Sequence, residues 1–344
     1  MQRILRCALV VCAVSVLFCA PGYTEEDTQK GAAAPLDPQQ LKKELSFVLG
    51  KQETSGTWPR TISYTFTTYD YRQDSFRKEE RVFVMTKKPM RIIPHSVGVA
   101  EILWAICPRE RIVAFNEFSA QPDSSVIAEE IRSRGPIFLQ GQTELVIGYQ
   151  PDLIFTVFYS SADFKEKLKQ AGIPFFDLGY FGTIESIKEQ ILLIGRIIGE
   201  EANASALVAL MNTRIQEIQA SIPMRKKPIR VLYYDEGGYV PGISSNFTSM
   251  CGIIGAVNVG AEQGVKSWKQ IDNETLLAWN PDVIVVPEES NLKEFLKSSK
   301  VLSHLTAIKS GTVYTVPMAI LKADSQFMVL SADMLAGIVY GGIR

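Results

Sequence analysis

Aromatic and polar side chains gather where short apolar runs of the sequence end. In the first half they are His95, Ser96, Glu117, Phe118, Tyr159 and Ser160, and in the second half Tyr234, Glu236, Tyr239, Trp268, Glu288 and Lys322. Aromatic rings bury the flat face of a large organic group, while hydroxyl, imidazole and carboxylate groups fix its orientation by hydrogen bonds. This mixture of side chains favours binding of a large planar or chelated molecule.

Enzyme motifs are missing from the same stretches. Gly252-Ile-Ile-Gly255 and Gly237-Gly238 lack the spacing of a dinucleotide-binding loop, and Gly242-Ile-Ser-Ser-Asn lacks the second glycine of a hydrolase nucleophile elbow. No metal-hydrolase cluster follows a predicted strand either. We therefore expect a protein that is not an enzyme and has no resident cofactor.

Histidine is too scarce for a bare zinc or manganese site. The chain contains only His95 and His304, whereas such sites need several histidines or carboxylates that converge. We predict no bare transition-metal site, although a site in which Tyr159, Tyr234 and Glu236 hold Fe(III) remains an alternative. His95 itself could ligate haem iron, contact an oxyanion or satisfy a nearby backbone group.

A segment that occurs twice, 130 residues apart, predicts the scaffold for these side chains. One copy runs from Glu144 to Pro151-Asp152, and the other from Glu274 to Pro281-Asp282. In each copy a Pro-Asp pair ends a short apolar helix, and an all-apolar run typical of a buried parallel strand follows. Sheets of this kind bind ligands at the carboxyl ends of their strands, where the candidate residues fall. The repeat predicts an α/β fold with two doubly wound lobes.

A long helical region separates the two copies, and its second half, residues 203–221, would measure roughly 28 Å. That length allows a single helix to join the lobes. We divide the chain into a signal peptide (1–24), a tether (25–60), an N-terminal lobe (61–182), a helical region with the interlobe helix (183–222) and a C-terminal lobe (223–344). Apolar and polar side chains alternate in residues 61–85, as they do in the strands of an antiparallel hairpin. We expect this hairpin at a sheet edge.

The first residues have the features of a secretory leader. Arg3 and Arg6 precede an uncharged run that is too short to span a membrane permanently, so we expect the mature protein in the periplasm or at the cell surface. Cys19 offers a possible site of lipid attachment. Two other cysteines, Cys107 and Cys251, fall in different lobes, and we expect two buried thiols. The formal net charge of -1 gives no indication of nucleic-acid binding.

Taken in order, several of these motifs resemble one known family. They are Pro89-Met-Arg-Ile-Ile-Pro-His-Ser, the two Glu…Pro-Asp copies, Gly172-Ile-Pro and Gly311-Thr-Val-Tyr-Thr-Val-Pro. The chain resembles the periplasmic substrate-binding proteins of ABC importers that take up ferric siderophores, haem and cobalamin. The resemblance implies that a metal chelate is held between two lobes joined by one long helix. It also implies delivery to a permease and its ATPase by a monomer.

The resemblance assigns further roles, each with a simpler alternative. Glu144 and Glu274 match the glutamates that dock on the permease, but a helix dipole also favours glutamate in a first turn. Trp268 matches a tryptophan just before the second docking helix, but could simply pack beneath that helix. No arginine cluster accompanies Lys322 in the cleft-forming loops, which weakens the case for strongly anionic siderophores. A receptor for a small oxyanion such as molybdate, or a surface receptor without a transport role, remain alternatives.

Overall fold

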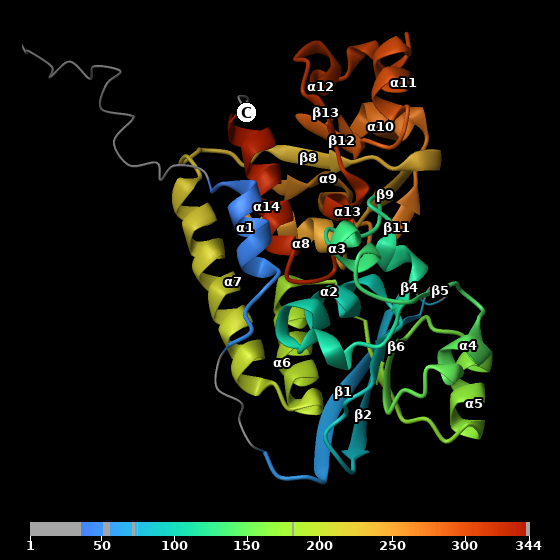
Figure 1. Cartoon of the computed structure of the whole chain (residues 1–344). Helices are drawn as coiled ribbons and strands as arrows, with labels where there is room; N and C mark the ends of the chain where they lie inside the picture. Colours follow the sequence, from blue (N-terminus) through green and yellow to red (C-terminus); the bar gives the residue numbers. More distant parts are fainter. Residues whose placement is uncertain (1–35, 51–55, 71–72, 74, 181, 342–344) are drawn as a thin grey trace, which may run out of the picture. The chain divides into compact units, whose positions relative to one another are not determined.

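The computed structural model describes residues 36–50, 56–70, 73, 75–180 and 182–341, so the predicted leader and Cys19 lie outside the described residues. The strands are β1 (Arg60–Asp70), β2 (Ser75–Met85), β3 (Ile92–Pro94), β4 (Phe115–Asn116), β5 (Ile137–Phe138), β6 (Leu153–Val157), β7 (Phe175–Leu178), β8 (Arg230–Tyr233), β9 (Tyr239–Pro241), β10 (Val257–Asn258), β11 (Trp268–Gln270), β12 (Val283–Pro287) and β13 (Val313–Val316). The helices are α1 (Pro38–Leu45), α2 (Val97–Ile106), α3 (Ala128–Arg132), α4 (Thr143–Gly148), α5 (Ala162–Gln170), α6 (Ile184–Ile198), α7 (Glu201–Ser221), α8 (Asn246–Ile253), α9 (Val259–Glu262), α10 (Asn273–Trp279), α11 (Leu292–Ser298), α12 (Thr306–Lys309), α13 (Met318–Leu321) and α14 (Met328–Ala336) (Figure 1).

Parallel sheets form the centre of each lobe. In the first lobe the strand order is β3-β6-β7, and the parallel pair β4-β5 adjoins β3 through a bridge between Ile92 and Ile112. In the second lobe four parallel strands follow the order β10-β8-β12-β13. Helices separate consecutive strands in both, as parallel connections require. The predicted fold class, two α/β lobes, is confirmed.

Alternate residues of the central strands face different hydrophobic cores, because successive side chains of a strand point to opposite faces. In β8, Val231 and Tyr233 belong to a large core, whereas Leu232 belongs to a second core within the second lobe. In β6, Phe155 belongs to the same large core and Ile154 to a third core within the first lobe. The large core also includes buried residues of α6, α7 and α14. One continuous apolar cluster therefore connects the two sheets through these helices.

The hairpin of β1 and β2 forms a sheet of its own and does not extend a parallel sheet. Its inner face packs on β7, where the rings of Tyr64 and Phe83 lie 4.4 and 5.0 Å from the ring of Phe176. Arg81 stacks over Phe66 and forms an ion pair with Asp177 at 3.5 Å. Contrary to the sequence prediction, the hairpin does not extend the edge of a parallel sheet. Ring packing, the Arg81 ion pair and a backbone hydrogen bond, from the Tyr180 N–H to the Thr67 carbonyl, attach it to the first lobe.

The tether predicted for residues 25–60 contains a helix that belongs to the fold. In α1, Leu41 and Leu45 are buried in the large core, and the helix packs against α7 and α14. Asp37 caps its first turn by accepting a hydrogen bond from the Gln39 N–H. The amphipathic spacing around Leu41 was visible in the sequence, but composition alone had suggested a linker.

A glycine breaks the helical region into two helices. Gly199 ends α6 with a left-handed backbone (φ 75°), which glycine adopts at no steric cost. After this corner α7 contacts α1 and α2 along one part of its length and α8 and α14 along another, and Figure 1 shows it running beside α6 and α14. The long interlobe helix predicted from the sequence is therefore present as α7.

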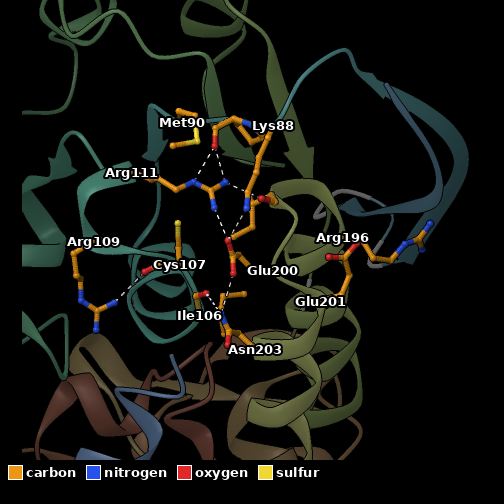
Figure 2. A network of polar contacts seen from close by, with 12 residues as sticks. Lys88, Met90, Ile106, Cys107, Arg109, Arg111, Arg196, Glu200, Glu201 and Asn203 are labelled. Carbon is orange, nitrogen blue, oxygen red and sulfur yellow. Dashed lines mark hydrogen bonds and ion pairs between the residues drawn. The ribbon is translucent and has the colours of Figure 1, made fainter. Parts of the chain in front are cut away.

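A buried ionic network fixes this corner to the first lobe (Figure 2). The Arg111 guanidinium donates to Glu200 at 2.6 Å, to the Ile198 carbonyl at 2.7 Å and to the Pro89 carbonyl at 2.6 and 2.9 Å. The side chains of Arg111 and Glu200 are each only 3% exposed. Asn203 donates to the other Glu200 oxygen at 2.9 Å. Together, these contacts join the start of α7 to the first lobe and to the end of α6.

Cys107 and Cys251 are both free and buried, as expected, and burial raises the pKa of the Cys107 thiol to about 12. Among the described residues, no helix is long and apolar enough to cross a membrane.

Candidate functional site

A cavity of about 420 Å³ opens in the first lobe near the carboxyl ends of β3, β4 and β6. The structure brings together there all the candidates from the first half: His95, Ser96, Glu117, Phe118, Tyr159 and Ser160. Phe138 and Phe164 complete the aromatic wall. Sequence reasoning missed these two rings, since β5 has only two residues and Phe164 lies on a helix.

His95 forms one side of this cavity and is held in place from several directions. Its backbone N–H donates to the Phe155 carbonyl at 2.9 Å, its Nδ1 lies 2.9 Å from the Ser160 hydroxyl, and its ring stacks on Phe164 at 4.3 Å. Burial, helped by the positive charge of Lys165, lowers the pKa of His95 to about 4. The imidazole is therefore neutral at physiological pH.

Asn116 and Phe118 line the same cavity, and each has side-chain surface without a partner. Asn116 is 6% exposed, and its Oδ1 accepts from the Ser119 N–H at 3.0 Å, but its Nδ2 has no hydrogen-bond partner within the described residues. A buried donor without a partner costs about 1–3 kcal/mol. Phe118 leaves 42% of its surface exposed. This wall therefore presents an aromatic face, and the amide donor beside it is buried.

A second cavity, of about 540 Å³, lies in the second lobe and includes the candidates Glu236, Tyr239, Trp268 and Lys322. Trp268 stands on β11, which pairs antiparallel with β9, and its ring meets that of Tyr233 edge-on at 5.7 Å. The side chain is 40% exposed. The alternative of a tryptophan packed beneath a helix does not hold, and the free face of the ring lines the cavity.

Tyr234 and Glu288 do not line either cavity, contrary to prediction. Backbone pairing continues one residue beyond β8 and β12, since the Tyr234 N–H donates to the Val285 carbonyl and the Glu288 N–H to the Val316 carbonyl. Strand alternation then turns Tyr234 into the second-lobe core, where burial raises its pKa. Glu288 is exposed outside the cavity, and its neighbour Glu289 lines it instead.

A smaller cavity of about 210 Å³ links the two halves of the site. It shares Tyr159 with the first-lobe cavity, and it shares Met318 and Lys322 with the second-lobe cavity. The three cavities therefore follow one another from lobe to lobe. Aromatic and polar side chains predicted from distant parts of the sequence contribute to a single run of cavities.

Two buried carboxyl groups lie at this junction, and sequence reasoning missed both. Glu101, in the middle of α2, accepts hydrogen bonds from the Ser125 and Ser325 hydroxyls and from the Val126 N–H. Burial raises the pKa of Glu101 to about 7 and that of Asp324 to about 6. Nothing in the pattern of a helix predicts that one of its carboxyls will be enclosed between two lobes.

The two predicted docking residues occupy equivalent exposed positions. Glu144 lies in the first turn of α4 and Glu274 in the first turn of α10, and both are exposed. A bond to its own backbone N–H, together with Lys167, lowers the pKa of Glu144. Neither glutamate lines one of the cavities described above. The two carboxylates are thus free to contact another protein while the cavities are occupied.

An arginine–aspartate clamp holds each of these helices to its sheet. In the first lobe, Asp152 accepts from the Arg91 N–H at 2.8 Å, and the Arg91 guanidinium donates to the carbonyls of Tyr149 and Gln150 at the end of α4. The cation also opposes the negative end of the helix dipole.

The second lobe repeats this clamp. Asp282 accepts from the Arg230 N–H at 2.9 Å, and the Arg230 guanidinium donates to the carbonyls of Trp279 and Asn280 at the end of α10. Left-handed residues, Gln150 (φ 50°) and Asn280 (φ 42°), precede the Pro-Asp pair in both lobes. The sequence repeat therefore encodes a structural clamp whose arginine lies outside the repeat.

A model of a family described as periplasmic binding protein matches residues 95–319. The chain belongs to the periplasmic binding protein family. The resemblance inferred from the motifs is confirmed.

Similar proteins include a cobalamin-binding protein and an uncharacterized substrate-binding lipoprotein of an ABC transporter. A cobalamin-binding protein of Halobacterium salinarum is 23% identical over 318 residues, covering 90% of this chain and 77% of that protein. An ABC transporter substrate-binding lipoprotein of Bacillus subtilis is 24% identical and covers 74% of this chain and 81% of its own length. Both relatives are named as binding proteins.

Solved structures of the periplasmic binding protein family share the fold. A haem-binding protein from a Roseiflexus species superposes with a TM-score of 0.64 at 17% identity, covering 74% of this chain and 99% of that chain. A Staphylococcus epidermidis protein described as a possible iron-binding (periplasmic solute-binding) protein gives a TM-score of 0.66 at 22% identity, covering 74% of this chain and 100% of that chain.

Proposed function

We propose that this protein captures a metal chelate, namely a ferric siderophore, haem or cobalamin, between its two lobes and delivers it to the permease of an ABC importer. The observation that carries the proposal is the run of cavities from lobe to lobe. The smallest cavity shares Val97, Ser124 and Tyr159 with the first-lobe cavity, and Met318 and Lys322 with the second-lobe cavity. Its exposed rings, among them Trp268, provide the apolar surface that a macrocycle or an aromatic chelator buries. The names of the relatives support the same ligand classes.

Delivery requires a surface that is free while the ligand is held. Glu144 and Glu274 meet this need, because they are exposed on equivalent helices and lie outside the cavities. We assign them to contacts with cationic residues of the permease, whose ATPase would power the transfer. The leader predicted for residues 1–24 places this exchange outside the cytoplasm, with Cys19 as the candidate lipid anchor.

A thermal-shift panel on the mature protein tests the ligand class. Cyanocobalamin, haemin, a ferric siderophore and molybdate are added in turn, and saturation at 100 times Kd should add about 2.7 kcal/mol of stability. A clear shift with one chelate and none with molybdate is expected. A shift with molybdate alone would favour the oxyanion alternative, and no shift with any chelate would contradict the proposal.

Uptake separates the transport role from a surface receptor without one. Cells that carry the gene together with its permease and ATPase genes should accumulate the ligand identified by the thermal shifts, and cells lacking the permease should not. Ligand binding without permease-dependent uptake would indicate a receptor that does not serve transport.

A further inference from the structure

The charges that face the site are almost all negative. The linings of the three cavities contain one ammonium group, Lys322, and no arginine, counted over the described residues. The same linings contain the following carboxyl groups: Glu101, Glu117, Asp123, Asp163, Asp235, Glu236, Glu289 and Asp324. A ligand that enters this site therefore meets a surface rich in hydrogen-bond acceptors.

The ammonium group is already engaged. Lys322 Nζ lies 3.1 Å from Asp235 Oδ2, and the Asp235 side chain is only 15% exposed. The same aspartate accepts from the Tyr233 hydroxyl at 3.0 Å, which holds the pair against the strand. Lys322 therefore brings little net positive charge to the second-lobe cavity.

The remaining polar groups do not supply positive charge either. His95 is neutral, since its pKa is about 4. Lys165, which lies close enough to influence His95, pairs with Asp177 at 2.8 Å and is not part of the lining. The unpartnered Asn116 Nδ2 is a neutral donor. The site thus combines aromatic faces, neutral amides and hydroxyls with carboxylates.

We infer that the site selects chelates whose periphery is neutral or cationic and rich in donors, such as a macrocycle bearing amide groups, over chelates that bear carboxylates or catecholates. This inference rests on the proposed function and specifies its ligand. A carboxylate on the ligand would face the carboxylates of the lining at short range, and Coulomb repulsion between like charges would weaken its binding. Amide N–H groups would instead donate to Glu117, Glu236 and Glu289.

A matched pair of ligands tests the inference directly. Dicyanocobyrinic acid bears carboxylates around a corrin ring, and its fully amidated counterpart has the same ring and metal without those charges. Calorimetry at low salt should show the amidated form binding about 100-fold more tightly. Added salt should narrow the difference, because it screens the repulsion.

Charge-reversed variants then locate the effect. Glu236→Lys places a cation in the second-lobe cavity, and the preference for the amidated form should fall about 10-fold. Glu288→Lys is the matched control, because Glu288 is exposed near the cavity without lining it, and the preference should change less than about 2-fold.

Three results would overturn the inference. They are equal or tighter binding of the carboxylate form, tight binding of haemin without binding of the amidated corrinoid, and equal effects of the two variants. The proposed function would survive each of these results, because a chelate would still bind. If no chelate binds at all, the proposed function fails and the inference fails with it.

Discussion

Removing Glu200 should destabilise the protein more than removing any surface carboxylate. The variant Glu200→Ala leaves the Arg111 guanidinium in place, with its side chain 3% exposed and its partner at 2.6 Å lost. Breaking a buried pair in this way costs about 3–5 kcal/mol, because the Arg111 charge stays buried without its counter-ion and keeps only the carbonyls of Pro89 and Ile198 as acceptors. Asn203 also loses the oxygen to which it donates at 2.9 Å. At about 2 °C per kcal/mol for a chain of this size, Tm should fall by roughly 6–10 °C.

Urea unfolding followed by circular dichroism, with a calorimetric scan, measures this loss. Glu166→Ala is the control. The Glu166 side chain is 58% exposed and forms a long ion pair of 3.9 Å with Lys169, and an exposed pair of this kind contributes about 0–1 kcal/mol to the free energy of unfolding. The double variant Arg111→Met/Glu200→Leu should recover much of the lost stability, since no charge stays buried. If Glu200→Ala costs no more than Glu166→Ala, the network does not hold the α6–α7 corner and our reasoning is wrong.

Other predictions concern docking, ligand binding and pH. The double variant Glu144→Arg/Glu274→Arg should abolish permease-dependent uptake with an unchanged ligand Kd, and normal uptake would rule out the docking role. Trp268→Leu should weaken ligand binding about 10-fold by titration, because a half-exposed aromatic face is lost; unchanged affinity would remove Trp268 from the site. The pKa of Glu101 is raised from 4.5 to about 7 by burial, so the folded state binds more protons than the unfolded state between these values. Stability should fall by roughly 3 kcal/mol as pH rises from 4.5 through 7, and Glu101→Gln should remove this loss in urea titrations at pH 5 and 8; an identical pH dependence in the variant would contradict the assignment.

The lobes were predictable because their signals are local. An apolar run, a Pro-Asp pair and a helical period each arise from neighbouring residues, and the sequence shows them directly. The same logic predicted the candidates at strand ends, and it failed at Tyr234 and Glu288, whose backbone N–H groups still pair with the neighbouring strand. A shift of one residue turns a side chain to the other face of a sheet.

The features that escaped prediction depend on contacts between distant segments. Glu101 lies on an ordinary helix. Its special environment depends on Ser325, which is distant in sequence and donates a hydrogen bond to it at 2.5 Å. Phe164 likewise lies on a helix, and its role becomes visible only when its ring stacks on His95. Arg111 and Glu200 are 89 positions apart, and nothing in either neighbourhood indicates a buried pair. Such pairings arise from the tertiary arrangement.

The duplicated arginine–aspartate clamp also restricts how the distance between the two exposed glutamates can change. Each exposed glutamate sits on a helix tied to its own sheet, through Arg91 in one lobe and Arg230 in the other. The span between Glu144 and Glu274 therefore changes only when one lobe turns against the other. A partner that contacted both carboxylates would therefore respond to the angle between the lobes without touching a bound ligand.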